Sequence, residues 1–148
     1  MVISFSLSLP RDELSVPVVR RLCRSALDDL GVARSCVGDI ELAVTEACTN
    51  VLKHANGTQD SYDVMVSVDE SDCDIRVVDS GAGFDHAETG RDEPPVADES
   101  GRGILLMRAL VDRVHFASIP EQGTIVHLQK HLDLTDASIL KQLAIADA

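Results

Sequence analysis

Five short stretches of the chain have the hydrophobic pattern of β-strands, in most cases an alternation of apolar and polar residues. They are Val2–Leu9, Tyr62–Val68, Asp74–Val78, Arg113–Ser118 and Thr124–Lys130. In the first stretch every second residue from Ile3 to Leu9 is apolar, and no basic flank precedes it. This pattern predicts a strand and not a signal peptide or a membrane span.

Other segments have apolar residues at helical spacing. A turn at Pro10–Glu13 opens a first helix that ends at Gly31. Its predicted apolar face consists of Leu14, Val18, Leu22, Cys23, Ala26, Leu27 and Leu30. A second helix starts near Ser35 and ends near 54–57. Its predicted buried positions are Val37, Ile40, Ala43, Val44, Ala47, Cys48 and Val51.

Two further helices are predicted in the second half of the chain. Gly101-Arg102-Gly103 leads into a short helix that carries Ile104, Leu105, Met107, Arg108, Leu110 and Val111. In the tail, Thr135 can cap a possible last helix with Ile139, Leu140 and Leu143 on one face.

The order of elements is a strand, two helices, two strands, a long loop, a helix and two strands. This order predicts an α+β fold, a two-layer α/β sandwich whose mostly antiparallel mixed sheet carries helices on one face. One domain is expected over residues 1–132, followed by a tail over 133–148. The loop, at about 85–100, contains six acidic residues and two prolines. A stretch of this length without periodicity is typical of a lid over a functional site.

Composition narrows the possible partners. With 25 acidic against 13 basic residues the formal net charge is -12, so nucleic acid and anionic membranes would be repelled. Aromatic residues make up only 3% of the chain, which predicts an aliphatic core. The four cysteines, Cys23, Cys36, Cys48 and Cys73, form no CxxC pair, which makes a zinc site a poor interpretation. We expect a cytoplasmic protein with reduced and mostly buried thiols.

The second predicted helix contains two polar residues one turn apart, Glu46 and Asn50, with Lys53 and His54 extending the same stripe. A solvated helix face is the simplest interpretation of an isolated pair. A carboxylate can also act as a general base, and an amide oxygen is a suitable ligand for Mg²⁺. The pair alone does not decide between these interpretations.

Two glycine motifs follow. Asp79-x-Gly81-x-Gly83 ends an apolar strand, so Asp79 can accept a hydrogen bond from an exocyclic amine while the glycines allow a ligand to approach the backbone. The same letters are also common in turns. Gly101-x-Gly103 precedes a helix, where free N–H groups can cradle phosphate, although a loop hinge has the same pattern. Neither motif fits a Walker A loop or a Rossmann fingerprint.

Taken in order, the motifs resemble a known family. Glu46-Ala47-Cys48-Thr49-Asn50 with His54-Ala55, the segment from Asp79 to Phe84, Ser100 to Ile104, and Gly123-Thr124 are similar to the conserved boxes of the gyrase–Hsp90–histidine kinase–MutL ATPase superfamily. The details look most like its small bacterial members, the anti-sigma factor serine/threonine kinases of stress and sporulation. The resemblance extends over about Val2 to His131.

The resemblance implies a role for each motif residue. Asn50 would coordinate a Mg²⁺ ion that bridges the ATP phosphates, and Glu46 would be the catalytic base. Asp79 would bind the adenine amine with support from Thr124. The remaining implied ATP-binding residues are His54, Gly81, Gly83, Gly101, Arg102, Gly103 and Ile104.

The function implied is an anti-sigma factor that binds a sigma factor and phosphorylates a serine or threonine of an anti-anti-sigma partner, as a homodimer. The alternative is a non-catalytic module of the same fold, in which ATP only sets the conformation that binds a partner. A histidine kinase is disfavoured because no dimerising hairpin precedes the first predicted strand. His115, His127 and His131 have no carboxylate or cysteine at metal-ligand spacing.

Overall fold

The computed structural model describes residues 1–54, 60–80, 98–119 and 123–146. Five strands form one sheet in the order β1-β2-β3-β5-β4, and each neighbouring pair in this described part is antiparallel. The strands are β1 (Ile3–Pro10), β2 (Ser61–Val68), β3 (Asp72–Ser80), β4 (Arg113–Ile119) and β5 (Gly123–His131). The predicted strands are confirmed, and most of them extend by one or two residues beyond the predicted ends.

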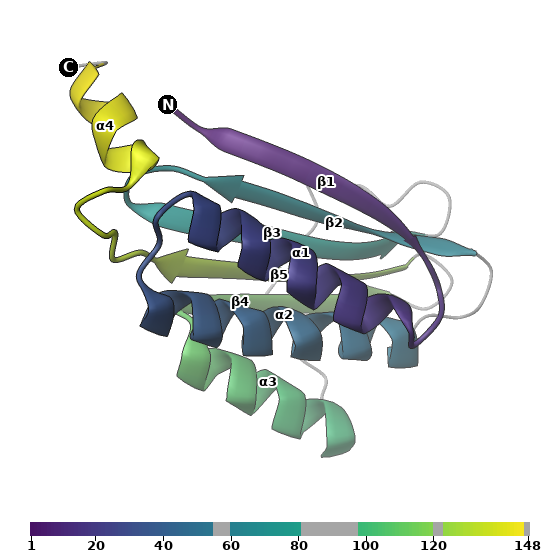
Figure 1. Cartoon of the computed structure of the whole chain (residues 1–148). Coiled ribbons are helices and arrows are strands. Elements are labelled where there is room, and N and C mark those ends of the chain that lie inside the picture. The colour runs from purple at the N-terminus through teal and green to yellow at the C-terminus, as the bar shows by residue number, and fades with distance from the viewer. Residues whose placement is uncertain (55–59, 81–97, 120–122, 147–148) are drawn as a thin grey trace.

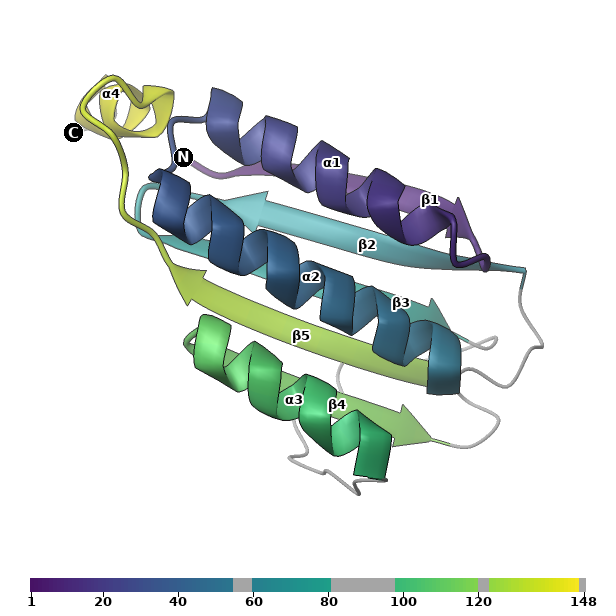
Figure 2. The same cartoon turned by 60° about the horizontal axis from the view of Figure 1, so that its bottom comes forward.

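Helices α1 (Ser15–Asp29), α2 (Arg34–His54) and α3 (Asp98–Leu110) cover one face of this sheet (Figure 1). Seen from the helical side, α2 lies in the middle over β3 and β5, with α1 and α3 on its flanks (Figure 2). The fold is therefore the predicted two-layer α+β sandwich. No helix in the described ranges is long and apolar enough to cross a membrane.

The core lies between the two layers. Strand β2 alternates as predicted, with the side chains from Tyr62 to Val68 buried at every second position. The predicted apolar face of α2 is also confirmed, since its members are at most 3% exposed. They are Val37, Ile40, Ala43, Val44, Ala47, Cys48 and Val51. Aliphatic side chains thus supply most of this core, and burial of their surface is the main favourable term in folding.

Helix α1 buries only part of its predicted apolar face, since Cys23 and Leu27 are buried as predicted and other members are not. Leu14, Val18 and Leu22 were expected to point inward, but they are 78%, 45% and 44% exposed. The buried row is Ser15, Val19, Cys23 and Leu27, so the helix is rotated by about one residue. A hydrogen bond sets this rotation, because Ser15 Oγ lies 2.6 Å from the buried Tyr62 hydroxyl and 2.6 Å from the carbonyl oxygen of Asp12.

The chain leaves α1 through Gly31, as predicted. Gly31 has φ 77°, a left-handed conformation that glycine adopts without strain. The N–H groups of Gly31 and Val32 bond back to the carbonyls of Asp28 and Leu27, which closes the helix end. A Cβ on Gly31 would lie 2.6 Å from Ser138 Cα, so the two segments touch.

The tail forms helix α4 (Ile139–Ala146), which lies near the N-terminus in Figure 1. Thr135 was expected to cap it. Instead Ser138 does so, because its Oγ accepts a hydrogen bond from Leu140 N and donates one to the Leu30 carbonyl. Leu140 is buried as predicted, whereas Ile139, expected on the same face, is 44% exposed.

The four cysteines are free and buried, as predicted. Burial raises the pKa of Cys23 to about 11 and those of Cys48 and Cys73 to about 12. A thiol with such a pKa is almost wholly protonated near neutral pH, and the thiolate is the reactive form. These cysteines therefore act as small apolar side chains of the core.

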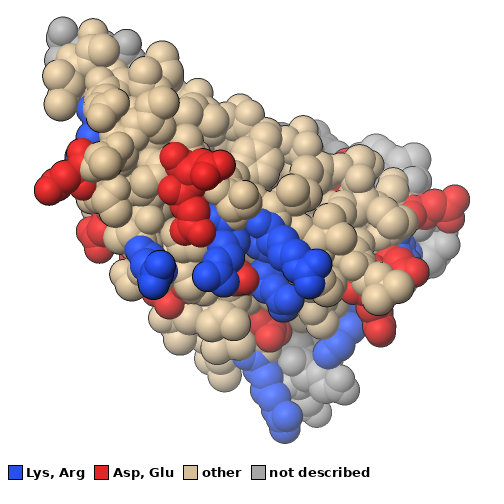
Figure 3. Space-filling model, in the orientation of Figure 1, with Lys and Arg blue, Asp and Glu red and all other residues tan. Residues whose placement is uncertain are grey.

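Charge is unevenly distributed over the helical face. Lys and Arg side chains gather over α1 and α2 in the middle of this face, although the whole chain is acidic (Figure 3). Arg20 and Arg24 of α1 both lie within 3.6 Å of a Glu41 carboxylate oxygen on α2. These pairs join two helices, but partly exposed ion pairs add little to stability.

Candidate functional site

Five polar residues are buried in the described part of the chain: Ser15, Asn50, Asp79, Thr124 and Ser138. A buried polar group is costly unless something satisfies it, so each one calls for a reason. The two serines anchor α1 and α4 through the hydrogen bonds given above. The other three are residues that the sequence placed in a nucleotide site.

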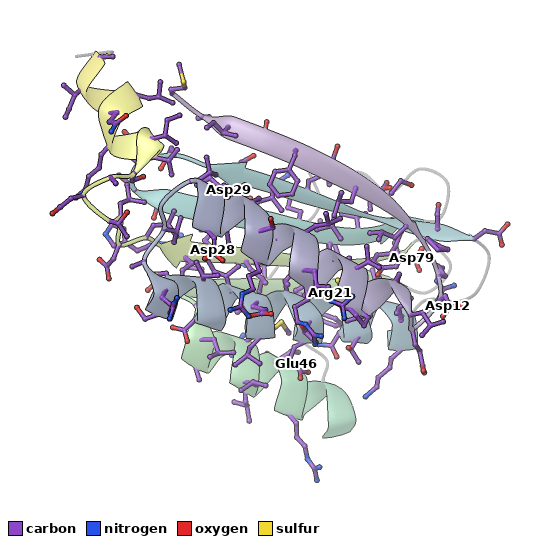
Figure 4. The ribbon with its side chains drawn as sticks, in the orientation of Figure 1. Asp12, Arg21, Asp28, Asp29, Glu46 and Asp79 are labelled. Carbon is purple, nitrogen blue, oxygen red and sulfur yellow. The ribbon has the colours of Figure 1, made fainter. Side chains whose placement is uncertain are left out.

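Asn50 and Glu46 lie one turn apart on α2. Asn50 is only 3% exposed, and its Nδ2 atom is buried without a hydrogen-bond partner. Glu46 is half-buried, on the side of α2 that faces α3 (Figure 4). The interpretation of this stripe as a solvated face is therefore wrong for Asn50. A buried amide that lacks a partner is available to a ligand.

Gly103 of α3 closes over this pair. A Cβ built on Gly103 would come within 3.1 Å of Asn50 Nδ2, 3.3 Å of Asn50 Oδ1 and 3.2 Å of Glu46 Oε2. Real Cβ atoms rarely approach this closely, so glycine lets α3 pack directly against the two polar side chains. A cavity of about 280 Å³ opens beside them, lined by Glu46, Lys53, Arg102, Gly103 and Leu106.

The start of α3 differs from the prediction. Gly101 and Gly103 were expected ahead of a helix, but α3 begins at Asp98, so both glycines lie inside it. The expected loop over 85–100 therefore ends earlier, and its residues up to 97 lie outside the described residues.

Asp79 and Thr124 form the second part of the site. They face each other across β3 and β5, on the side of the sheet that the helices cover. Their exposed fractions are 4% and 1%. Burial raises the pKa of the Asp79 carboxyl, and the Arg11 guanidinium partly opposes this rise. The sequence suggested that Thr124 supports Asp79, and the register places the two residues directly opposite each other.

Arg11 is a neighbour that the sequence did not reveal. Its Nε atom lies 3.6 Å from Asp79 Oδ2, and its Nη2 donates a hydrogen bond of 3.3 Å to the Leu52 carbonyl. A lone arginine in a predicted turn carries no signal of this contact, because the contact joins positions far apart in the sequence.

The other predicted site residues occupy varied positions. Ile104 is buried in the core behind Gly103, and Arg102 is exposed at the cavity. His54 is the last residue of α2. Gly81 and Gly83 lie outside the described residues. The C-terminal half of α2, the end of β3, the start of β5 and the start of α3 all lie at one end of the sandwich (Figure 2).

Comparison with known proteins identifies the family of this chain. Residues 9–130 match the model of the histidine kinase-like ATPase domain. A serine-protein kinase RsbW from Bacillus velezensis is 28% identical over 86% of this chain and 84% of its own length. An anti-sigma F factor from Heyndrickxia coagulans is 35% identical, over 66% of this chain and 71% of its own length.

Solved structures show the same fold. The chain superposes on a structure of the RsbU and RsbW domains of a Mycobacterium tuberculosis protein with a TM-score of 0.67 and 20% identity, over 88% of this chain and 32% of that one. In the SiaB-SiaC complex from Pseudomonas aeruginosa, one chain matches with a TM-score of 0.57 and 11% identity. The chain belongs to the histidine kinase-like ATPase domain family, whose members use ATP.

Proposed function

We propose that this protein is an anti-sigma factor with serine/threonine kinase activity. It binds a sigma factor and uses ATP to phosphorylate a serine or threonine of an anti-anti-sigma partner. Relatives named as a serine-protein kinase and as anti-sigma F factors support this function. The observation that carries it is the meeting of Glu46, Asn50 and Gly103, because a base next to a ligand-binding amide is what phosphoryl transfer requires.

The residues present fit a bound Mg²⁺–ATP. The buried Asn50 amide has an end without a partner, and rotation of the amide can present its oxygen, a ligand type that Mg²⁺ accepts. Gly103 leaves room where any side chain would intrude. When bound, Mg²⁺ would neutralise charge on the phosphates. Asn50 would hold the ion. Gly101, Arg102 and Gly103 of α3, with the backbone of the buried Ile104, would line the phosphates.

The chain's own residues would perform the remaining steps. Glu46 would accept the proton of the attacking hydroxyl, a step that typically adds about 10²–10⁴-fold in rate. Asp79, backed by Thr124, would accept a hydrogen bond from the adenine amine. His54 would help to shape the site, as the family resemblance implies. We propose that Gly81 and Gly83 line the base pocket, as the family resemblance implies.

Two further expectations belong to the same proposal. A protein that binds a sigma factor works where transcription occurs, so we place it in the cytoplasm. We also propose that it is a homodimer, and that residues 1–132 form the ATPase domain to which the tail over 133–148 is attached. Light scattering of the purified protein measures the oligomeric state, and a monomeric mass would contradict the homodimer.

The function can be tested with partner proteins encoded next to this protein's gene. We expect a neighbouring sigma factor to bind with measurable affinity, and an anti-anti-sigma protein to take up label from γ-labelled ATP on serine or threonine. Failure of the sigma factor to bind would contradict the anti-sigma role. Sigma binding without any label on the second protein would leave a non-catalytic ATP-dependent binder in place of the kinase.

A further inference from the structure

Arg11 lies in the connection between β1 and α1, and three contacts hold it at the base-binding end of the site. Its backbone N–H donates to the Asp60 carbonyl over 3.0 Å. Its guanidinium bonds to the Leu52 carbonyl near the end of α2 and lies 3.6 Å from the Asp79 carboxylate. Figure 4 shows Asp79 at this end of the molecule, beside the connection that carries Asp12. Contacts with Asp60 just before β2, with α2 and with β3 thus hold this arginine in place.

The cation faces a carboxylate that has little contact with water. The side chains of Arg11 and Asp79 are only 13% and 6% exposed. Burial disfavours the charged form of a carboxyl group, and an adjacent guanidinium favours it. Thr124, directly opposite Asp79 on β5, is uncharged, and so is Leu52 of α2, whose carbonyl accepts the bond from Arg11. Two charged residues, Glu13 and Lys53, line a cavity together with Arg11. The positive charge of Arg11 lowers the pKa of the Asp79 carboxyl and so partly offsets the rise caused by burial.

The separation of the two groups leaves the carboxylate available for a ligand. At 3.6 Å, the contact between Arg11 Nε and Asp79 Oδ2 is an ion pair but longer than an ordinary hydrogen bond. An ionised carboxylate has about four acceptor positions, so Asp79 can still accept from a ligand. The Leu52 carbonyl holds the guanidinium back at this distance.

We propose that Arg11 is a positioning residue that holds Asp79 as an oriented, ionised acceptor and thereby sets the preference for 6-amino over 6-oxo purine nucleotides. This inference rests on the proposed function, in which Asp79 meets the 6-position of the base. A carboxylate only accepts hydrogen bonds, so it pairs with the amine of ATP and repels the carbonyl of GTP. A protonated carboxyl can donate to that carbonyl, so losing the charge erodes the preference.

The test compares equilibrium affinities for ATP and GTP between pH 6 and pH 8.5 in wild type, Arg11→Met and Arg11→Lys. Arg21→Met, on the exposed surface of α1, is the matched control. Without the cation the pKa of Asp79 rises further, so ATP affinity in Arg11→Met should fall as pH is lowered and recover as it is raised. The preference for ATP over GTP should drop by about tenfold or more at pH 6, the change expected when one hydrogen bond to a charged acceptor is lost. Arg11→Lys and Arg21→Met should stay close to wild type.

Two outcomes would overturn the proposed role of Arg11. A third arm of the experiment tests the proposed nucleotide site itself. An Arg11→Met protein with the wild-type preference and the wild-type pH profile would show that the cation is not needed. Equal losses in Arg11→Met and Arg11→Lys at all pH values would show a structural role only. Asp79→Ala, which has no acceptor atom in its side chain, is the third arm: if it binds ATP normally, Asp79 does not meet the base, and the failure belongs to the proposed site itself.

Discussion

Gly103 of α3 approaches Asn50 of α2 so closely that a Cβ at position 103 would lie 3.1 Å from the amide nitrogen. The contact brings the third helix onto the polar pair of the second. Gly103→Ala should therefore displace the side-chain ends of Asn50 and Glu46. Because an error of about 1 Å in position can cost about 10²-fold in rate, we expect a loss of at least roughly tenfold in phosphoryl transfer. Label transfer from ATP measures it.

Gly38→Ala is the matched control for this change. Gly38 lies in α2, and nothing lies within 4 Å of the position a Cβ would take there. Alanine should raise the free energy of unfolding by about 0.5–1 kcal/mol through helix propensity alone, and leave activity unchanged. If both variants lost activity equally, the loss would not come from the Gly103–Asn50 contact.

Removal of the Asn50 amide should abolish ATP binding while it leaves the stability of the fold nearly unchanged. The amide nitrogen is buried without a partner, so it costs free energy in the absence of ligand. We expect Asn50→Ala to lose ATP binding and transfer together, while the free energy of unfolding changes by less than about 1 kcal/mol. Isothermal titration with ATP and urea unfolding measure the two quantities. A large loss of stability with intact ATP binding would mean that Asn50 is structural.

Two adjacent valines test the rotation of α1. Val19 is fully buried, whereas Val18 is 45% exposed. Val19→Ala should lower the free energy of unfolding by about 2 kcal/mol, through lost burial and the cavity left behind. Val18→Ala should change it by no more than about 0.5 kcal/mol. Urea unfolding compares the two variants. A larger loss of stability in Val18→Ala than in Val19→Ala would show that Val18 lies on the buried face, as the sequence predicted.

The contact between Gly31 and Ser138 makes the exit from α1 sensitive. Gly31→Ala would place a side chain in a left-handed conformation, at φ 77°, and 2.6 Å from the Ser138 backbone. The conformation alone costs about 1–2 kcal/mol, and the clash adds to it. Thermal unfolding should show a clear drop in Tm. An unchanged Tm would show that the tail does not pack on this turn.

The sequence predicted the parts of the fold that depend on local periodicity. Strand β2 and helix α2 have regular apolar positions, and both bury the predicted faces. The first half of helix α1 departs from the predicted face because a serine occupies a core position, and the contact of Ser15 with Tyr62 is visible only in three dimensions. Long-range contacts override local pattern in such places.

The residues of the candidate site also fall into those that the sequence predicted and those that it could not. Motif order indicated Glu46, Asn50, Asp79 and the glycines, because each motif carries its own chemistry. The contact between Arg11 and Asp79 could not be predicted, since 68 positions separate the two residues and neither has a motif that names the other. The start of α3 was also missed, because Asp-Glu-Ser fits a loop as well as a first helical turn.

In the proposed mechanism, Glu46 converts an ATP-binding site into a kinase. Glu46→Gln keeps the size of the side chain and removes its ability to accept a proton. The decisive measurement is single-turnover transfer of label from bound ATP to the anti-anti-sigma partner, with ATP affinity measured in parallel. We predict a transfer rate lower by about 10²–10⁴-fold with ATP affinity close to wild type. Transfer at the wild-type rate in Glu46→Gln would contradict the claim.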